Sequence, residues 1–430
     1  MSGIRIPEKS GRRGLQTVVS LFLVTFALMK HRIIIICLAV LVGLGAAARE
    51  TADSLCLTEA APQAPVRIAA GAAALGAGIV ARSTAPSVMN IAPGLTGKKS
   101  TPVADVAQYL PLAFPWAMKA LGSPTRSGWG RMAVSQAFGA VIMAGATEAM
   151  KRSVMSRRPD GSDWRSFPSG HTAWAFLGAT ATAIELGERS PWYAVGAYAF
   201  ASGVAVSRVI DGRHFPADVA AGAGVGIISA QLGYWLGDAV FGRRQLNPMS
   251  GGLDCDDDSR LSLSLVSGLR YELGHQRVGD RRFSVTPALT AALSLGWRLH
   301  SHFSLGLSAA MSSAYLVSGE VLTAQLNTVG GSVSGAYLLD FGRVWRWDCG
   351  VGAGLRHNIG LRHAPADLEV GGLSPEGRVE TGLSLRLHGR LGCRASLGYE
   401  LSSRKLRTGV VEKRSTVQSL TAALCATVAF

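Results

Sequence analysis

Apolar residues follow two different periodicities along the chain, and the change between them falls near residue 260. Upstream, six apolar segments have helix-like length and spacing. They span approximately 66–81, 103–121, 128–155, 170–187, 191–208 and 216–241. Downstream, apolar and polar residues alternate, as they do in strands with one buried face. The pattern therefore predicts a multidomain α + β chain, in which a six-helix bundle precedes an antiparallel eight-stranded β-barrel.

The alternating region divides into eight predicted strands, near 260–273, 283–299, 302–317, 329–341, 344–360, 376–388, 391–404 and 416–430. Longer connections at 274–282, 318–328, 361–375 and 405–415 alternate with short turns at His300-Ser301, Gly342-Arg343 and Gly389-Arg390. Polar side chains occupy the face opposite the apolar band, namely Arg346, Asp348, Arg386, His388, Arg394 and Glu400. An even strand number, a polar lumen and a terminal Phe430 are typical of outer-membrane barrels. A soluble β-sandwich or a lipid-carrying periplasmic barrel is the alternative.

The N-terminal region has the features of a secretory signal peptide that starts at Met29. A basic Lys30-His31-Arg32 precedes an apolar run, and Ala46-Ala47-Ala48 supplies a cleavage site. A transmembrane anchor, helped by a second apolar run at 15–29, is the alternative. The predicted organisation is an over-extended start plus signal peptide (1–48, the peptide being 29–48), a linker (49–65), a helical domain (66–245), a second linker (246–259) and the barrel (260–430).

Composition narrows the possible partners. With 43 Lys+Arg against 28 Asp+Glu, the chain carries a net charge of +15, which suits an anionic partner. Zinc-finger spacing, a basic helix and an RNA-binding signature are all missing from the sequence, so we do not expect nucleic acid binding. Charged residues make up only 17%, as expected for segments in or against a membrane.

The six cysteines define no disulfide framework. Cys37 lies in the signal peptide, and Cys349 and Cys393 fall on apolar strand faces, where they resemble small hydrophobic residues. Cys56 and Cys255 can pair in an oxidising periplasm. No Cys/His cluster has metal-ligand spacing, so we expect no metal and no cofactor.

Three short motifs at predicted helix boundaries carry the chemistry. They are Lys151-x6-Arg158-Pro159, then Pro168-Ser169-Gly170-His171, and last Ser207-Arg208-x5-His214-x3-Asp218. A phosphate needs cations, forked donors and backbone N–H groups. Lys151, Arg158 and Arg208 supply the charge, while Ser169, Gly170 and the start of the fourth helix supply further donors.

Two histidines complete the chemistry, because a neutral imidazole can attack phosphorus and a protonated one can deliver a proton to the leaving group. Asp218 is predicted to lie four residues after His214 on a helix, where it can hold the ring in one tautomer, as in a catalytic triad. The spacing therefore makes His214 the predicted nucleophile and leaves His171 as the acid. Each motif alone is more often a helix cap or a turn, but eleven specified positions in order favour a single phosphate site.

The three motifs resemble those of the type 2 phosphatidic acid phosphatases, which share their core with bacterial class A acid phosphatases and vanadium haloperoxidases. The resemblance covers about residues 66–241 and matches every specified position. It implies that His214 forms a phosphohistidine, that Asp218 orients it and that His171 protonates the leaving group. It also implies that Lys151, Arg158, Ser169, Gly170 and Arg208 hold phosphate, with no metal required. Only eight residues separate Pro159 from Pro168, which is short for a lipid phosphatase and argues against a large lid. Asp160, Asp163 and Trp164 in this segment are interpreted as a solvated loop.

The leading hypothesis is a lipid phosphatase of the Gram-negative envelope acting on the 1-phosphate or 4′-phosphate of lipid A, with resistance to cationic peptides as a consequence. The alternatives are an undecaprenyl pyrophosphate or phosphatidylglycerophosphate phosphatase, a nonspecific acid phosphatase, a vanadium haloperoxidase, and a non-catalytic outer-membrane binding protein. An even strand number returns the chain to its starting side, so the helical domain is expected in the periplasm beside an outer-membrane barrel. The inner membrane is the alternative location. The sequence does not predict an oligomeric state.

Overall fold

The structure, a computed structural model, describes residues 63–85, 88, 90–91, 102–187, 189–242, 260–341, 345–362, 364–388 and 391–429. Several predicted features lie outside these residues. They are the signal peptide, the Cys56–Cys255 pair, the turns at Gly342-Arg343 and Gly389-Arg390, and Phe430.

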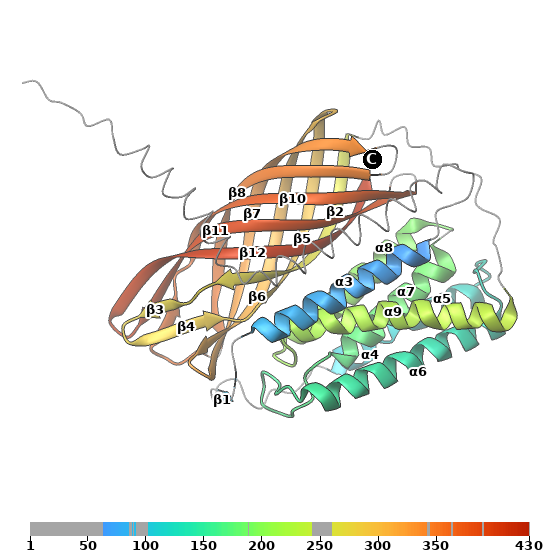
Figure 1. Ribbon diagram of the computed structural model, residues 1–430, viewed down its shortest axis with the longest axis horizontal. Coiled ribbons are helices and arrows are strands. Elements are labelled where there is room, and N and C mark those ends of the chain that lie inside the picture. Colours follow the sequence, from blue (N-terminus) through green and yellow to red (C-terminus); the bar gives the residue numbers. More distant parts are fainter. Residues whose placement is uncertain are drawn as a thin grey trace, which may run out of the picture. The chain divides into compact units, whose positions relative to one another are not determined.

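Seven helices are found within the described residues (Figure 1): α3 (Gln63–Thr84), α4 (Pro102–Ala107), α5 (Leu110–Ala120), α6 (Trp129–Val154), α7 (Gly170–Leu186), α8 (Pro191–Ile210) and α9 (Pro216–Phe241). The prediction of six is wrong because the segment 103–121 forms two helices, α4 and α5. Pro111 lies in the first turn of α5. Its ring cannot continue a preceding helix, since it lacks an N–H and collides with the carbonyl four residues earlier.

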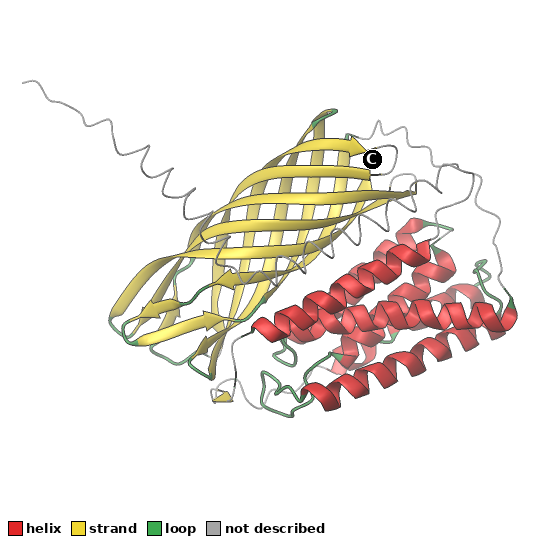
Figure 2. Ribbon diagram, viewed as in Figure 1, coloured by secondary structure: helices red, strands yellow, loops and turns green. Residues whose placement is uncertain are grey.

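Helix α9 is the central element of the helical part and is buried along most of its length. It lies against α3, α6 and α7 in the helical part, which Figure 2 shows in red. The glycines of α9 let these helices approach closely. A Cβ added at Gly222 would lie 2.5 Å from the carbonyl oxygen of Ser169, and one at Gly226 would lie 2.3 Å from that of Ala173. No larger residue fits at these two contacts, so the glycines set the spacing between α9 and α7.

The strands form a closed antiparallel ring of eight: β2 (Leu261–Leu273), β5 (Ala288–His300), β6 (Phe303–Ser318), β7 (Val321–Phe341), β8 (Trp345–Arg362), β10 (Leu373–His388), β11 (Leu391–Thr408) and β12 (Val411–Ala429). Pairing of β12 with β2 and of β6 with β7 closes it. Four short strands lie outside the ring: β1 (Asn90–Ile91), β3 (Gln276–Val278), β4 (Arg281–Val285) and β9 (Leu368–Val370). The predicted strand number is therefore confirmed for the ring.

The two faces of the ring differ in polarity. One face exposes large apolar side chains, among them Leu295, Trp297, Leu307, Val333, Val351 and Leu355. The other carries ion pairs such as Arg394 with Asp348 and Arg356 with Glu400, whose acceptor oxygens are almost fully buried. Alternation along each strand produces this division, as the sequence pattern predicted.

Two predictions about connections are wrong. The predicted strand 283–299 is divided into β4 and β5 by Pro287, which cannot donate a ladder hydrogen bond. The segments 318–328 and 405–415 are mostly paired strand instead of long loops, with two-residue turns at 319–320 and 409–410. Apolar alternation continues through 322, 324 and 326, all of which are buried.

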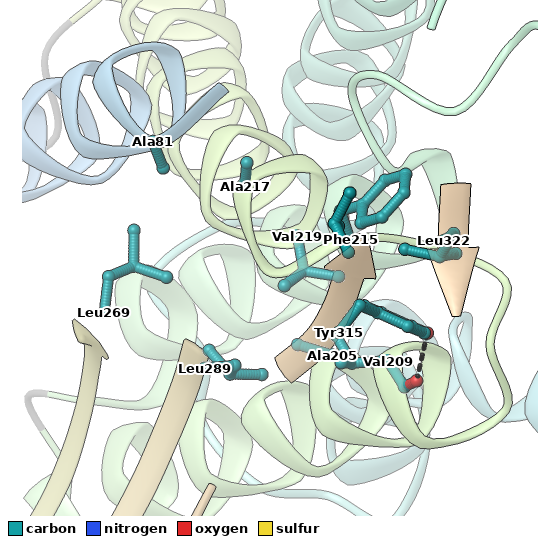
Figure 3. Packing of buried hydrophobic residues seen from close by; sticks show 11 residues of the cluster. Ala81, Ala205, Val209, Phe215, Ala217, Val219, Leu269, Leu289, Tyr315 and Leu322 are labelled. Carbon is teal, nitrogen blue, oxygen red and sulfur yellow. Dashed lines mark hydrogen bonds between the residues drawn. The ribbon is translucent and has the colours of Figure 1, made fainter. Parts of the chain in front are cut away.

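One apolar cluster combines helical and strand residues (Figure 3). Tyr315 of β6 is fully buried, packs edge-on against Phe215 and donates its hydroxyl to the carbonyl of Val209 at 3.0 Å. Gln325 of β7 donates its amide to the same carbonyl, also at 3.0 Å. Strand side chains therefore add two donors to a backbone carbonyl at the end of α8 that also accepts the N–H of Gly212.

Three of the described helices, α3, α8 and α9, are long and apolar enough to cross a membrane, by length and composition. Most of α9 is buried inside the helical part itself, whereas little of α3 is.

Candidate active site

The first part of the site is the N-terminus of α7. Ser169 is its N-cap and is fully buried, and its Oγ accepts hydrogen bonds from the backbone N–H of Thr172 at 3.4 Å and from its hydroxyl at 3.1 Å. The proton of Ser169 is therefore free for another acceptor. Gly170 opens the helix, and the ammonium of Lys151 lies 3.7 Å from the place where a Cβ would be. Free N–H groups, a helix dipole and a cation thus face one point.

Lys151 and Arg158 come from the end of α6 and the loop after it. Lys151 lies in the last turn of α6, where burial and the positive charges of Arg158 and Arg165 lower its pKa. Arg158 donates its Nε to Asp163 at 2.8 Å, which fixes the guanidinium and leaves its terminal nitrogens available. An anion placed here would relieve the repulsion between the cations.

Arg208 lies in the last turn of α8, with its side chain only 2% exposed. Its Nε and Nη1 are buried and donate no hydrogen bond within the described part of the chain. Buried guanidinium donors almost always have acceptors, because an unsatisfied charged donor is strongly unfavourable. Arg208 is thus arranged for an anionic ligand.

His214 precedes α9, which begins at Pro216, so the predicted helical relation between His214 and Asp218 is wrong. Asp218 lies in the first turn of α9, where its Oδ2 accepts the N–H of Phe215 at 2.8 Å and the hydroxyl of Ser166. The same oxygen lies 3.6 Å from Nδ1 of His214, close enough for an ion pair but too far for a hydrogen bond. Both side chains are buried, and burial lowers the pKa of His214, while Asp218 opposes that shift.

His171 follows Gly170 and is partly exposed. Burial, followed by the charge of Arg208, lowers the pKa of His171 to about 4. Its Nε2 lies 2.9 Å from Oδ1 of Asp105, a residue of α4 that no motif includes. The His171 imidazole is therefore neutral at pH 7 unless an anion enters the site.

The loop between Pro159 and Pro168 is not the solvated segment that was predicted. Asp160 is 3% exposed and accepts hydrogen bonds from Ser162 and, at 2.7 Å, from Arg213, the neighbour of His214. Ser166 is fully buried and donates to Asp218. Trp164 and Asp163 match the prediction: Trp164 is 54% exposed, with the guanidinium of Arg157 over its ring, and the Asp163 side chain is 42% exposed. A cis peptide bond joins Phe167 to Pro168.

The structure brings the eight predicted residues together through a chain of short-range interactions. Beyond the effect of burial, the positive charges of Arg158 and Arg208 lower the pKa of His214, and those of Arg208 and His214 lower the pKa of His171. Lys151 approaches Gly170, and the N–H of Ser169 donates to the carbonyl of Asp218 at 2.9 Å. Among the described residues, no group of three His, Cys, Asp or Glu side chains could hold a metal ion. The arrangement can bind a phosphoryl group between three cations and present two imidazoles to it.

Residues 131–241 match the family model of the PAP2 superfamily. A lipid A 1-phosphatase of Porphyromonas gingivalis is 44% identical over 146 residues, which are 34% of this chain and 33% of that protein. The match thus spans about a third of the relative's length.

Several solved structures are similar to this chain over less than half of its length. Aquifex aeolicus LpxE is 25% identical, with 31% of this chain and 87% of that chain covered and a TM-score of 0.25. Neisserial surface protein A is 14% identical over 40% of this chain and 96% of that chain, with a TM-score of 0.29. Pseudomonas aeruginosa OprG is 10% identical over 40% and 98%, with a TM-score of 0.33.

Proposed function

We propose that this protein is a lipid phosphatase that removes the 1-phosphate of lipid A. The observation that carries the proposal is the convergence of Lys151, Arg158 and Arg208 on the N-terminus of α7, with buried Arg208 donors that make no hydrogen bond among the described residues and only a 3.6 Å ion pair with Asp105. Such a site matches the charge and shape of a phosphoryl group. The PAP2 match and the similarity to a protein named lipid A 1-phosphatase support phosphate ester hydrolysis.

The reaction proceeds in two displacements. His214, kept neutral by its lowered pKa, attacks phosphorus with a ring nitrogen; the N–P bond forms as the P–O bond to the lipid breaks. His171 gives its proton to the departing oxygen. Water then loses a proton to His171 and attacks the phosphohistidine, which releases inorganic phosphate and restores neutral His214. Asp218 balances the charge that develops on His214.

Charge changes explain how His171 becomes an acid. Its pKa of about 4 is set first by burial and then by the positive charge of Arg208. A phosphate dianion bound between Arg208 and His171 neutralises that field and raises the pKa of His171. The proton that His171 delivers thus becomes available once substrate is bound.

The strand ring supports a lipid substrate. Its exposed apolar face suits a hydrocarbon environment, and its charged residues lie on the opposite face. We propose that the ring is an outer-membrane barrel and that the helical domain faces the periplasm. The three apolar helices favour the inner membrane as the alternative location.

Mass spectrometry of lipid A tests the substrate. Cells that express the wild-type chain should lose one phosphate from lipid A, at the glucosamine 1-position, whereas cells with His214→Ala should keep it. His275→Ala, which removes an exposed histidine of the connection between β2 and β3, is the matched control and should behave as wild type. Unchanged lipid A with the wild-type chain would reject the substrate, and loss of the 4′-phosphate would reject the position.

Two further measurements separate chemistry from location. Quenching a reaction of labelled substrate should trap an acid-labile phosphate on the wild-type protein, but none on His214→Ala. Membrane fractionation with protease treatment of intact cells tests the location. Recovery in the inner membrane, or digestion of the helical domain from outside, would contradict the proposed placement.

A further inference from the structure

The carboxylate of Asp105 contacts two residues of the candidate site. Its Oδ1 lies 2.9 Å from Nε2 of His171 and 3.6 Å from Nη1 of Arg208. Asp105 belongs to α4, outside residues 131–241 that match the family model, and is separated from His171 by 66 positions. None of the three motifs includes it.

The contact determines which nitrogen of His171 can exchange a proton. A carboxylate at Nε2 accepts the proton of that nitrogen, so Nδ1 is the nitrogen left for the leaving oxygen. It also holds the ring in one orientation, as the aspartate of a catalytic triad does for its histidine. Because Asp105 lies on α4 and His171 on α7, the contact also links these two helices.

Charge gives the contact a second effect. Arg208 from α8 and His214 from the loop before α9 both disfavour the protonated form of His171, and Asp105 is the group that favours it. Without Asp105, a protonated His171 would lie partly buried among like charges. Such a group has already lost its proton at neutral pH, so it cannot act as the general acid there.

We propose that Asp105 is a positioning residue for the acid step, one that orients His171 and stabilises its protonated form. This inference rests on the proposed phosphatase function. Asp105 itself touches no reacting atom and acts through His171. In the alternative role, the carboxylate would only compete with phosphate for Arg208. The two roles are distinguished by their effects on kcat and KM.

Leaving-group dependence gives the sharpest test. Detergent-solubilised full-length protein is assayed with a phosphorylated lipid, whose alkoxide needs protonation, and with 4-nitrophenyl phosphate, whose phenolate needs little. Asp105→Asn should lower kcat for the lipid about 10- to 100-fold, part of the contribution usual for general acid catalysis. On nitrophenyl phosphate the loss should be within about threefold, with KM nearly unchanged for both.

The pH profile supplies the second readout. The alkaline limb of kcat for the lipid should move to lower pH in Asp105→Asn, and Asp105→Glu should restore much of both rate and profile. Asp238→Asn is the matched control, since Asp238 also pairs with arginines but lies near the far end of α9. Its profile should equal that of the wild type.

The outcomes are distinct. Equal loss on both substrates, an unmoved profile in Asp105→Asn, or failure of Asp105→Glu to restore activity would overturn the proposal. A lower KM with unchanged kcat would show that Asp105 only competes with phosphate. A wild-type chain inactive on both substrates would instead reject the proposed function.

Discussion

The ion pair between Asp160 and Arg213 joins the loop that follows the first motif to the loop that carries His214. The Asp160 side chain is 1% exposed and that of Arg213 17%, with 2.7 Å between Oδ2 and Nη1. The other carboxylate oxygen accepts the backbone N–H of Ser162 at 3.0 Å and its hydroxyl at 2.7 Å. Asp160→Asn should therefore loosen the His214 loop and keep the local fold.

The magnitude follows from the contacts. A hydrogen bond between charged groups contributes roughly 1.5–3 kcal/mol, and the partial exposure of Arg213 favours the middle of that range. If about 2 kcal/mol is lost from the productive loop conformation, kcat falls about 30-fold. Ser162→Ala removes one neutral donor from the same carboxylate and should lower kcat less than about fivefold.

A double-mutant cycle with Asp160→Asn, Arg213→Gln and the combined variant measures the coupling. Rates of inorganic phosphate release on the detergent-solubilised protein give the three differences, and amide hydrogen exchange of 158–166 reports the loop directly. We expect the combined variant to be hardly slower than either single one. Additive losses, or equal effects of Asp160→Asn and Ser162→Ala, would show that the pair does not position His214.

Three other outcomes are expected. Gly222→Ala places a Cβ 2.5 Å from the carbonyl of Ser169, so phosphate release should fall at least tenfold while circular dichroism stays unchanged; full activity would refute the contact. Tyr315→Phe should lower the free energy of unfolding by only about 1 kcal/mol, seen as a small fall in melting temperature, because Gln325 still donates to the same carbonyl; loss of folding would contradict this. Since burial lowers the pKa of His214 below 6.5, the nucleophile stays neutral at pH values somewhat below 6.5. The pH profile of phosphate release should therefore show activity below pH 6.5, and an acid-limb midpoint at or above pH 6.5 would contradict this.

Local signals account for most of what the sequence predicts correctly. Pro191, Gly170 and Pro216 begin α8, α7 and α9 at the expected positions, because proline and glycine mark helix starts through backbone geometry. Strict alternation likewise predicts the ring. The same signals mislead where two effects overlap. Alternation beyond residue 320 belongs to a longer β7, although it was interpreted as a loop.

Contacts between distant segments account for the remainder. The motifs identify the residues that face phosphate, since their types and spacing carry the chemistry. Other residues hold those side chains in place, but they follow no sequence motif and contact their partners only in the folded chain. They are Asp105, Asp160, Ser166 and Arg213. Pro111 marks the break between α4 and α5 in the sequence, but the apolar residues on both sides of it favoured one continuous helix.

The carbonyl at the end of α8 receives both its side-chain donors from the strand ring. A tether that merely held the helices at a membrane could be exchanged for any other membrane domain. This ring cannot be exchanged so freely. An unrelated ring would remove the tyrosine and glutamine donors from the carbonyl of Val209, the residue next to Arg208. The two halves of the chain are therefore expected to change together over evolutionary time, so that a swap of rings between relatives succeeds only when both donors travel with it.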